Sequence, residues 1–331
     1  MRTILLIATG GTIASRPTAA GGLAPAITSQ ELLSCVPELA EFCRIDTIQL
    51  YNLDSTNMGP EQWQGIAAAV QENYDRYDGF VITHGTDTMG YTAAALSYMI
   101  QKSPKPVVLT GGQKSIYNRD TDARNNLWRA VAYACHPDAW GVQIVFDNQV
   151  ILGTRARKTR TKSFNAFSSI DYPETAMFRD RRLIQFLQRP AEYTHAVFST
   201  ALDPNVFVLR LVPGMRADII PMLEGRYRAL VLESFGVGGL PGGDDGAMFA
   251  AVRDWCGAGH LAVFTTQVPH EGSDLAVYEV GRAAKALPGV LEAHDMTPEA
   301  TAVKLMWVLG QTTDRAEAEK LFLTPVQWDI L

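Results

Sequence analysis

Three apolar runs in the first third of the chain each end in a turn that is rich in glycine and threonine. The runs and their turns are IATGGTIA at 7–14, VITHGTDT at 81–88 and VVLTGG at 107–112. Each run predicts a short buried β-strand with the turn at its carboxyl end. In open parallel sheets ligands bind at that edge. The sequence therefore predicts a pocket lined by hydroxyl and amide groups where the three turns converge.

Strand-like and helix-like segments alternate through residues 1–185, which is the pattern of a parallel α/β sheet. Another strand and turn are predicted at 44–56, and residues 15–26, rich in small residues, are predicted to form a mobile loop. The apolar spacing predicts three helices. The inward positions are Trp63, Ala67, Val70, Tyr74 and Tyr77 in the first helix, Met89, Ala93, Leu96 and Ile100 in the second, and Leu127, Val131 and Ala134 in the third.

The second half of the chain begins a new α/β pattern. Strands are predicted at 205–214, 227–236 and 260–267, and Thr297 is predicted to cap a helix. Residues 185–205 contain Pro190 and Pro204 and have no clean period, so they indicate a linker. We expect an N-terminal domain at 1–188, a linker at 189–205 and a C-terminal domain at 206–331.

The charge and the cysteines limit the class of protein. The net charge is −6 and no Lys/Arg-rich helix is visible, which disfavours nucleic acid and anionic membranes as partners. The four cysteines are scattered and form no C-x-x-C pair, so free thiols in a reducing compartment are favoured over disulfides or a metal site. The first apolar run is too short for a signal peptide and no segment is long enough to span a bilayer. We expect a cytoplasmic protein.

Thr12 is the first candidate for chemistry. A threonine hydroxyl needs a base, an oxyanion site and a fixed position to act as a nucleophile. Gly10 and Gly11 would let the backbone approach a ligand closely. The alternative is that Thr12 caps a helix, but the Pro/Gly-rich stretch after it does not resemble one.

Thr86 and Asp87 lie between a predicted strand and a predicted helix. A carboxylate there must be satisfied by the helix N-terminus, by a lysine or by a ligand's ammonium group. The sequence leaves open whether Asp87 merely caps the helix. For His84, a structural hydrogen bond is favoured over a metal, because no second histidine lies at ligand spacing.

The segment TRARKTRTK at 154–162 could supply the cation. Its arginines, Arg155, Arg157 and Arg160, are interpreted as a solvated run. One lysine could turn inward toward Asp87 and complete a base relay without histidine. Spacing alone does not choose between Lys158 and Lys162.

Nucleotide-binding and serine-hydrolase motifs are absent from the sequence. GGQKS at 111–115 has Gln113 before the lysine, so it is not a P-loop. GVGGLPGG has Pro241 where a dinucleotide fingerprint needs glycine, and no candidate serine lies in a G-x-S-x-G elbow.

TGGTIA at 9–14 and THGTDTM at 83–89 resemble the two signatures of the bacterial-type L-asparaginase family, in the order and spacing of that family. Supporting segments are DSTNM (54–58), TGGQ (110–113), KTRTKSFNAFSS (158–169), LVPGMRAD (211–218), ESFGVGG (233–239) and HDMTPEATAVKL (294–305). The similarity runs from residue 3 to about 310 and is greatest to the cytoplasmic, type I branch. It implies two α/β domains, a larger N-terminal parallel-sheet domain and a smaller C-terminal one.

The resemblance also implies roles for single residues. Thr12 matches the nucleophile that forms an acyl-enzyme, and Thr86, Asp87 and Lys158 match the family's Thr-Lys-Asp group. Ser55 matches the serine that holds the substrate α-carboxylate, and Asp87 would receive the α-ammonium. Gly11, Gly85 and Thr56 complete the expected substrate-binding set. A homodimer or homotetramer with active sites near the subunit interface is implied.

One position departs from the family pattern. The family places a tyrosine on the mobile loop after the first signature, where this chain has Leu23 within GLAP at 22–25. Activation of Thr12 would then fall to Thr86 and Lys158 through water, or to another tyrosine, or turnover would be slow. Thr56 and Asn57 also differ from the commoner polar residues beside the serine.

The resemblance implies an asparaginase that hydrolyses L-asparagine to L-aspartate and ammonia without metal or cofactor. One alternative is action on L-glutamine, including as part of an amidotransferase; the latter is disfavoured because no further domain precedes residue 3. The other is an amino-acid-binding sensor on the same fold with weak or no catalysis.

Overall fold

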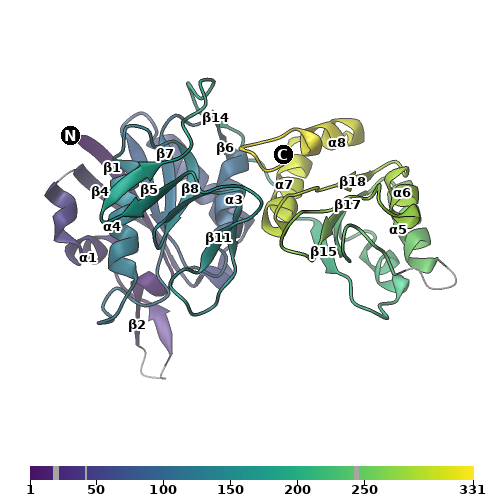
Figure 1. The fold of residues 1–331 in the computed structure, drawn as a ribbon, viewed down its shortest axis with the longest axis horizontal. Coiled ribbons are helices and arrows are strands. Elements are labelled where there is room, and N and C mark those ends of the chain that lie inside the picture. Colours follow the sequence, from purple (N-terminus) through teal and green to yellow (C-terminus); the bar gives the residue numbers. More distant parts are fainter. Residues whose placement is uncertain (18–21, 42, 242–245) are drawn as a thin grey trace. The chain divides into compact units, whose positions relative to one another are not determined.

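The computed structural model describes residues 1–17, 22–41, 43–241 and 246–331. The chain divides into two compact units, Met1–Thr200 and Ala201–Leu331 (Figure 1). The division falls inside the range predicted as a linker. Part of that range is nevertheless built into the first unit, because β14 (Val197–Phe198) pairs with β6 (Ile100–Gln101).

A sheet that includes β1, β4, β5, β7 and β8 forms the centre of the first unit (Figure 1). It has eight strands in the order β13-β12-β9-β8-β7-β5-β1-β4. Its strands are β1 (Arg2–Gly10), β4 (Cys43–Leu53), β5 (Gly79–Thr83), β7 (Pro106–Thr110), β8 (Gly141–Phe146), β9 (Gln149–Leu152), β12 (Ala176–Arg179) and β13 (Arg182–Gln185). From β4 to β8 all neighbours are parallel, which confirms the predicted parallel sheet.

The other neighbours in this sheet are antiparallel, which the sequence did not predict. Only Asp147 and Asn148 separate β8 from β9, and Asp147 has a φ of 53°. A two-residue hairpin can join only antiparallel strands, since a parallel neighbour needs a long crossover. The local turn therefore reverses the sheet direction at this edge.

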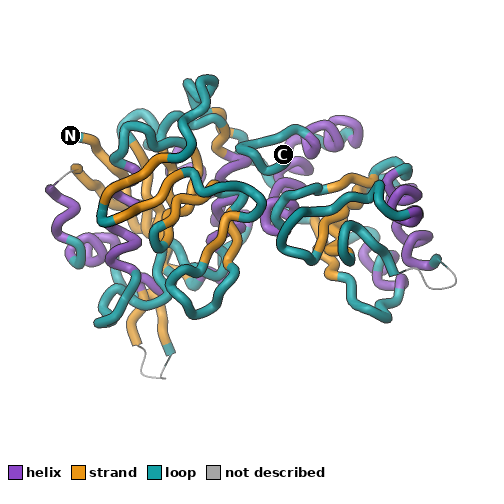
Figure 2. The backbone as a smooth tube through the Cα atoms, viewed as in Figure 1, coloured by secondary structure: helices purple, strands orange, loops and turns teal. Residues whose placement is uncertain are grey.

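Helices cover both faces of the parallel strands (Figure 2). They are α1 (Ser29–Ser34), α2 (Pro60–Glu72), α3 (Met89–Met99) and α4 (Ala123–Ala134). Ile4 and Leu6 of β1 belong to the same buried cluster as Leu127 and Val131 of α4. Because both faces are covered, β1, β5 and β7 are almost wholly apolar rather than alternating.

The prediction that the helix after Gly59 extends to Tyr77 was wrong. This helix, α2, ends at Glu72, and the chain then turns. Tyr74 and Tyr77 pack on Phe80 instead, with ring centroids 5.9 and 6.4 Å apart respectively. Aromatic burial against β5 therefore replaces continuation of the helix.

The predicted mobile loop at 15–26 is in part a hairpin. β2 (Ser15–Pro17) and β3 (Leu23–Pro25) pair antiparallel, with Arg16 opposite Ala24. Residues 18–21 and the side chain of Leu23 lie outside the described residues. A second small sheet joins β10 (Ala156–Lys158) to β11 (Phe167–Ser169).

The second unit is a smaller α/β domain, as expected. Its strands, all parallel, are β15 (Val206–Arg210), β16 (Ala229–Ser234), β17 (Leu261–Thr266) and β18 (Val290–Glu292), and its helices are α5 (Ala247–Gly257), α6 (Glu279–Lys285), α7 (Pro298–Gln311) and α8 (Arg315–Leu323). The hydroxyl of Thr297 accepts a hydrogen bond from Ala300 N at 3.1 Å, so α7 begins with the predicted cap.

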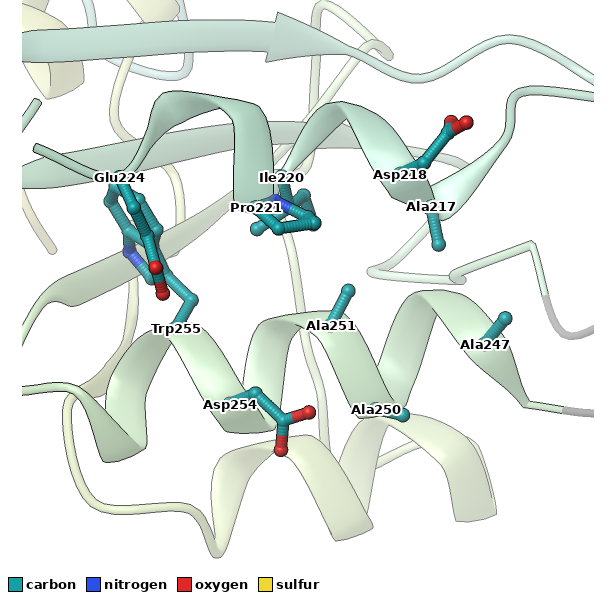
Figure 3. Close-up of a pocket in the computed structure, with 10 residues that line it drawn as sticks. All are labelled: Ala217, Asp218, Ile220, Pro221, Glu224, Ala247, Ala250, Ala251, Asp254 and Trp255. Atoms are coloured by element: carbon teal, nitrogen blue, oxygen red, sulfur yellow. The ribbon is translucent and has the colours of Figure 1, made fainter. Parts of the chain in front are cut away.

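A surface hollow of about 310 Å³ lies in the second unit, between α5 and the 3₁₀ turns η4 (Ala217–Ile219) and η5 (Pro221–Leu223) (Figure 3). Two of its carboxylates, Asp218 and Asp254, form ion pairs with Arg216 and Arg253. No hydroxyl or amide side chain is among its lining residues, so it lacks the groups of the predicted polar pocket.

Among the described residues, no helix combines the length and hydropathy needed to cross a membrane. The four cysteines are free thiols, as expected.

Candidate active site

Three turns from β1, β4 and β5 pack directly against one another at the carboxyl ends of these strands. A Cβ atom placed on Gly11 would lie 2.3 Å from Gly85 N, and Gly11 has a φ of +78°. A Cβ atom on Gly85 would lie 2.5 Å from Ser55 Oγ. Only glycine permits both approaches. Thr12 and Thr86 each follow one of these glycines, so the two signature turns meet where the sequence predicted.

Lys158 joins this region from β10. Its Nζ lies 2.7 Å from Thr86 Oγ1 and 2.7 Å from Asp87 Oδ1. The Lys158 side chain is only 15% exposed, whereas the Asp87 side chain is 61% exposed. Lys162 is exposed in the loop that follows. Spacing alone left two lysines open and the resemblance implied Lys158, which is the one that contacts Thr86 and Asp87.

Asp87 does not cap the helix that follows it. The N-cap residue of α3 is Thr88, and the Asp87 carboxylate is paired with Lys158. The Thr88 hydroxyl donates to the carbonyl oxygen of Ser55 at 2.7 Å. This bond ties the turn after β5 to the turn after β4, so Asp87 and Ser55 are held close to the same glycine contact.

His84 makes the structural hydrogen bonds that the sequence favoured. Its ring is fully buried, with Nδ1 2.7 Å from Gly85 O and Nε2 2.9 Å from Thr92 Oγ1. A carbonyl oxygen only accepts, so Nδ1 carries the proton and Nε2 accepts from the Thr92 hydroxyl. Burial lowers the pKa of His84 to about 4, which keeps the ring neutral at pH 7. His84 thus anchors the turn on α3.

Thr12 opens a short 3₁₀ turn, η1 (Thr12–Ala14), whose N-cap is Gly11 rather than Thr12. Gly11 N donates to Leu53 O at 2.9 Å, and the Ser15 hydroxyl donates to Gly11 O at 2.9 Å. The loop after β7 also holds this turn in place, because Ile116 N donates to Ile13 O at 3.1 Å. The backbone around Thr12 is fixed from three directions, and its side chain is half-buried.

Thr56 differs from Ser55 in its surroundings. Ser55 is buried, whereas Thr56 is exposed and its hydroxyl donates to Asp54 Oδ1 at 3.1 Å. The described contacts therefore bring Ser55, and not the Thr56 hydroxyl, against the glycine contact.

The interpretation of Arg155 as part of a solvated run was wrong. Arg155 is fully buried, and its guanidinium carbon lies 5.6 Å from the centre of the Tyr172 ring. Arg160 is exposed, as expected, and Arg157 is half-buried. Charged residues that are close in the sequence do not all face the solvent here, because the chain turns inward between β9 and β10.

Gln113 lies in the third of the predicted turns, but the sequence assigned it no role in the site. Its Oε1 lies 3.1 Å from Thr86 Oγ1, so it contacts the same hydroxyl as Lys158. Its position at the carboxyl end of β7, the strand next to β5, was a usable signal.

Among the described residues, no group of three or more histidine, cysteine, aspartate or glutamate side chains could hold a metal ion.

Two family models match nearly the whole chain. The model described as Asparaginase, N-terminal, matches residues 3–192, and the Glutaminase/Asparaginase C-terminal domain matches residues 205–322. The chain belongs to the asparaginase family.

Similar proteins agree with this assignment to the asparaginase family. The chain is 41% identical over 320 residues to an L-asparaginase of Thermococcus kodakarensis, covering 96% of each protein. The solved thermostable L-asparaginase of that organism superposes with a TM-score of 0.93 over 99% of both chains, at 38% identity. L-asparaginase I of Vibrio cholerae has a TM-score of 0.87 at 28% identity, covering 100% of this chain and 99% of that one.

One further relative is named for a different reaction. The chain is 37% identical over 336 residues to a component of the glutamyl-tRNA(Gln) amidotransferase of Pyrococcus furiosus. The alignment covers 97% of this chain and 75% of that protein. Similarity to this chain is therefore shared by proteins that are named for two different reactions.

Proposed function

We propose that this chain is an L-asparaginase, which hydrolyses the side-chain amide of L-asparagine to give L-aspartate and ammonia. The observation that carries the proposal is the position of the Lys158 amine, 2.7 Å from both Thr86 and Asp87, beside the contact between Gly11 and Gly85. A nucleophile, a proton relay and a substrate anchor are the parts that amide hydrolysis needs. The identity to the Thermococcus kodakarensis L-asparaginase supports the choice of substrate.

The first half-reaction is acylation of Thr12. Its hydroxyl oxygen attacks the amide carbon, and backbone N–H groups near Gly11 and Thr86 stabilise the oxyanion. The hydroxyl proton passes to the pair Thr86 and Lys158 and is returned to the departing nitrogen. The C–N bond breaks, ammonia leaves and an ester joins Thr12 to the aspartyl group. Water then attacks this ester and releases L-aspartate.

The two α-groups of the substrate would select a free amino acid. Asp87 would pair with the α-ammonium group, and Ser55 would hold the α-carboxylate, with Gly85 completing the lining. The Asp87 carboxylate is exposed and pairs with Lys158 through Oδ1, so it can also pair with a second cation, the α-ammonium group. We propose that the paired strands β2 and β3 close over this site and exclude water until acylation is complete.

No metal or cofactor is part of the proposed reaction, because acyl transfer needs only the groups named above. The proposal places the protein in the cytoplasm, in line with its free thiols. It also places the chain in a homodimer or homotetramer with active sites near the subunit interface.

An ammonia-release assay on L-asparagine and L-glutamine tests the function. We expect kcat/KM for asparagine to exceed that for glutamine by about tenfold or more, since an extra methylene displaces the amide carbon from Thr12. Glutamine as the better substrate would favour the glutaminase alternative, which the match to the Glutaminase/Asparaginase C-terminal domain model supports. Tight amino-acid binding with no ammonia released would favour a sensor and contradict the proposal.

A further inference from the structure

We propose that Gln113 is a positioning residue that sets the direction of the Thr86 hydroxyl. The inference rests on the proposed function, because it concerns how Thr86 takes part in proton transfer. In the resting enzyme, Gln113 keeps Thr86 a hydrogen-bond acceptor toward the proposed nucleophile, Thr12.

The orientation of the Gln113 amide follows from its partners. Gln113 Nε2 lies 3.1 Å from the carbonyl oxygen of Ser163, which can only accept a hydrogen bond. The NH₂ end of the amide must therefore face Ser163. The other end, Oε1, is an acceptor, and it lies 3.1 Å from Thr86 Oγ1.

The hydroxyl of Thr86 has one proton and two lone pairs. Since Gln113 Oε1 accepts, Thr86 must donate its one proton to Gln113. Lys158 Nζ, at 2.7 Å, then donates to one lone pair of Thr86. The single group left on Thr86 is a lone pair, which accepts the proton that Thr12 loses. As Thr86 accepts that proton, its own proton can turn from Gln113 to the departing amide nitrogen, so no extra proton remains on Thr86 and Lys158 stays paired with Asp87.

Gln113 is itself held in place by a buried polar network. Its backbone N donates to Asp122 Oδ2 at 2.9 Å, and Asp122 is 6% exposed. Asp122 also accepts from Asn126 Nδ2 at 3.1 Å, and the same nitrogen donates to Gly111 O at 3.0 Å. This network fixes the turn after β7 on the first turn of α4. Gln113 is therefore held both at its backbone N–H and at its amide NH₂ group. Because its Oε1 atom is fixed in this way, it sets the direction in which the Thr86 hydroxyl donates.

Steady-state kinetics on asparagine with three variants tests the inference. Gln113→Met keeps the length of the side chain and removes the acceptor, so kcat should fall about tenfold with KM within about twofold. Gln113→Glu keeps an acceptor oxygen and should retain a higher kcat than Gln113→Met. The control is Lys114→Met, whose side chain pairs with Asp120 away from Thr86 and which should match the wild type.

An unchanged kcat in Gln113→Met, an equal loss in Gln113→Glu, or a loss confined to KM would overturn the inference. If the wild type releases no ammonia, the proposed function fails, and neutron diffraction of the wild-type protein still decides the inference. We expect the Thr86 deuterium on the line to Gln113 Oε1. A deuterium on the line to Lys158 Nζ would contradict it.

Discussion

Lys158 shows how a single side chain depends on a fold for its chemistry. The residue lies 72 positions after Thr86, yet their polar atoms are 2.7 Å apart, because β10 brings the lysine beside the turn after β5. Residue type and order in the sequence suggested a lysine near Asp87. Local spacing does not choose between Lys158 and Lys162, because it does not give the direction of each side chain; the resemblance to the family implied Lys158. The contact of Gln113 with Thr86 was likewise not predicted, although the sequence placed Gln113 in the turn after the third apolar run.

The buried ring of His84 makes a prediction about stability at low pH. Its pKa is about 4 in the folded protein and about 6.5 in an unfolded chain, so the unfolded chain binds more protons between these values. The stabilisation by neutral His84 is complete above about pH 6.5 and is lost as the pH falls toward 4. We expect the free energy of unfolding to fall between pH 7 and pH 4.5 by about 2 to 3 kcal/mol more in the wild type than in His84→Asn.

Urea unfolding at the two pH values measures this difference. His195→Asn is the control, because His195 is exposed whereas His84 is fully buried. The same pH dependence in wild type and His84→Asn would show that the ring is not held neutral.

At the scale of elements, the strands were predicted better than the segments between them. The apolar runs before Gly10, Thr83 and Thr110 form β1, β5 and β7 because burial on both faces needs continuous apolar sequence. The hairpin of β2 and β3 was predicted as a loop, because each of these strands pairs with residues that are not adjacent to it in the sequence. The antiparallel edge was missed because Asp147 and Asn148 do not form one of the common glycine turns.

The contact between the turns predicts a large effect of one methyl group. In Gly85→Ala the new Cβ would overlap Ser55 Oγ and must push the two turns apart. We expect kcat/KM for asparagine to fall about a hundredfold, because a shift of about 1 Å in a catalytic group costs that much. The control is Gly59→Ala, where the nearest atom to a new Cβ is 3.6 Å away, and kcat/KM should stay within about twofold of the wild type. Equal activity in both variants would mean that the turns are not rigidly packed.

At the scale of the whole molecule, each unit has its own buried core. Leu127 and Val131 belong to the core of the first unit, and Leu230 and Trp255 to that of the second. The alternation of strands and helices on either side of residue 200 was visible in the sequence because each unit satisfies its own apolar periodicity. The assembly of subunits was not visible in the sequence, because the spacing of apolar residues does not indicate which exposed face contacts a second chain.

Light scattering on the purified protein tests the proposed assembly. We expect a mass of two or four times the 36.2 kDa chain at concentrations where the enzyme is active. A fully active species with the mass of one chain would contradict an active site near a subunit interface.

The identity of the nucleophile is the central claim, and it is tested most directly by the rate of ammonia release from L-asparagine in Thr12→Ala. The half-buried Thr12 side chain is small, so the variant should fold with an unchanged circular dichroism spectrum. Removing the nucleophile should lower kcat by about a thousandfold or more. A folded Thr12→Ala protein with a kcat within about tenfold of the wild type would contradict the account.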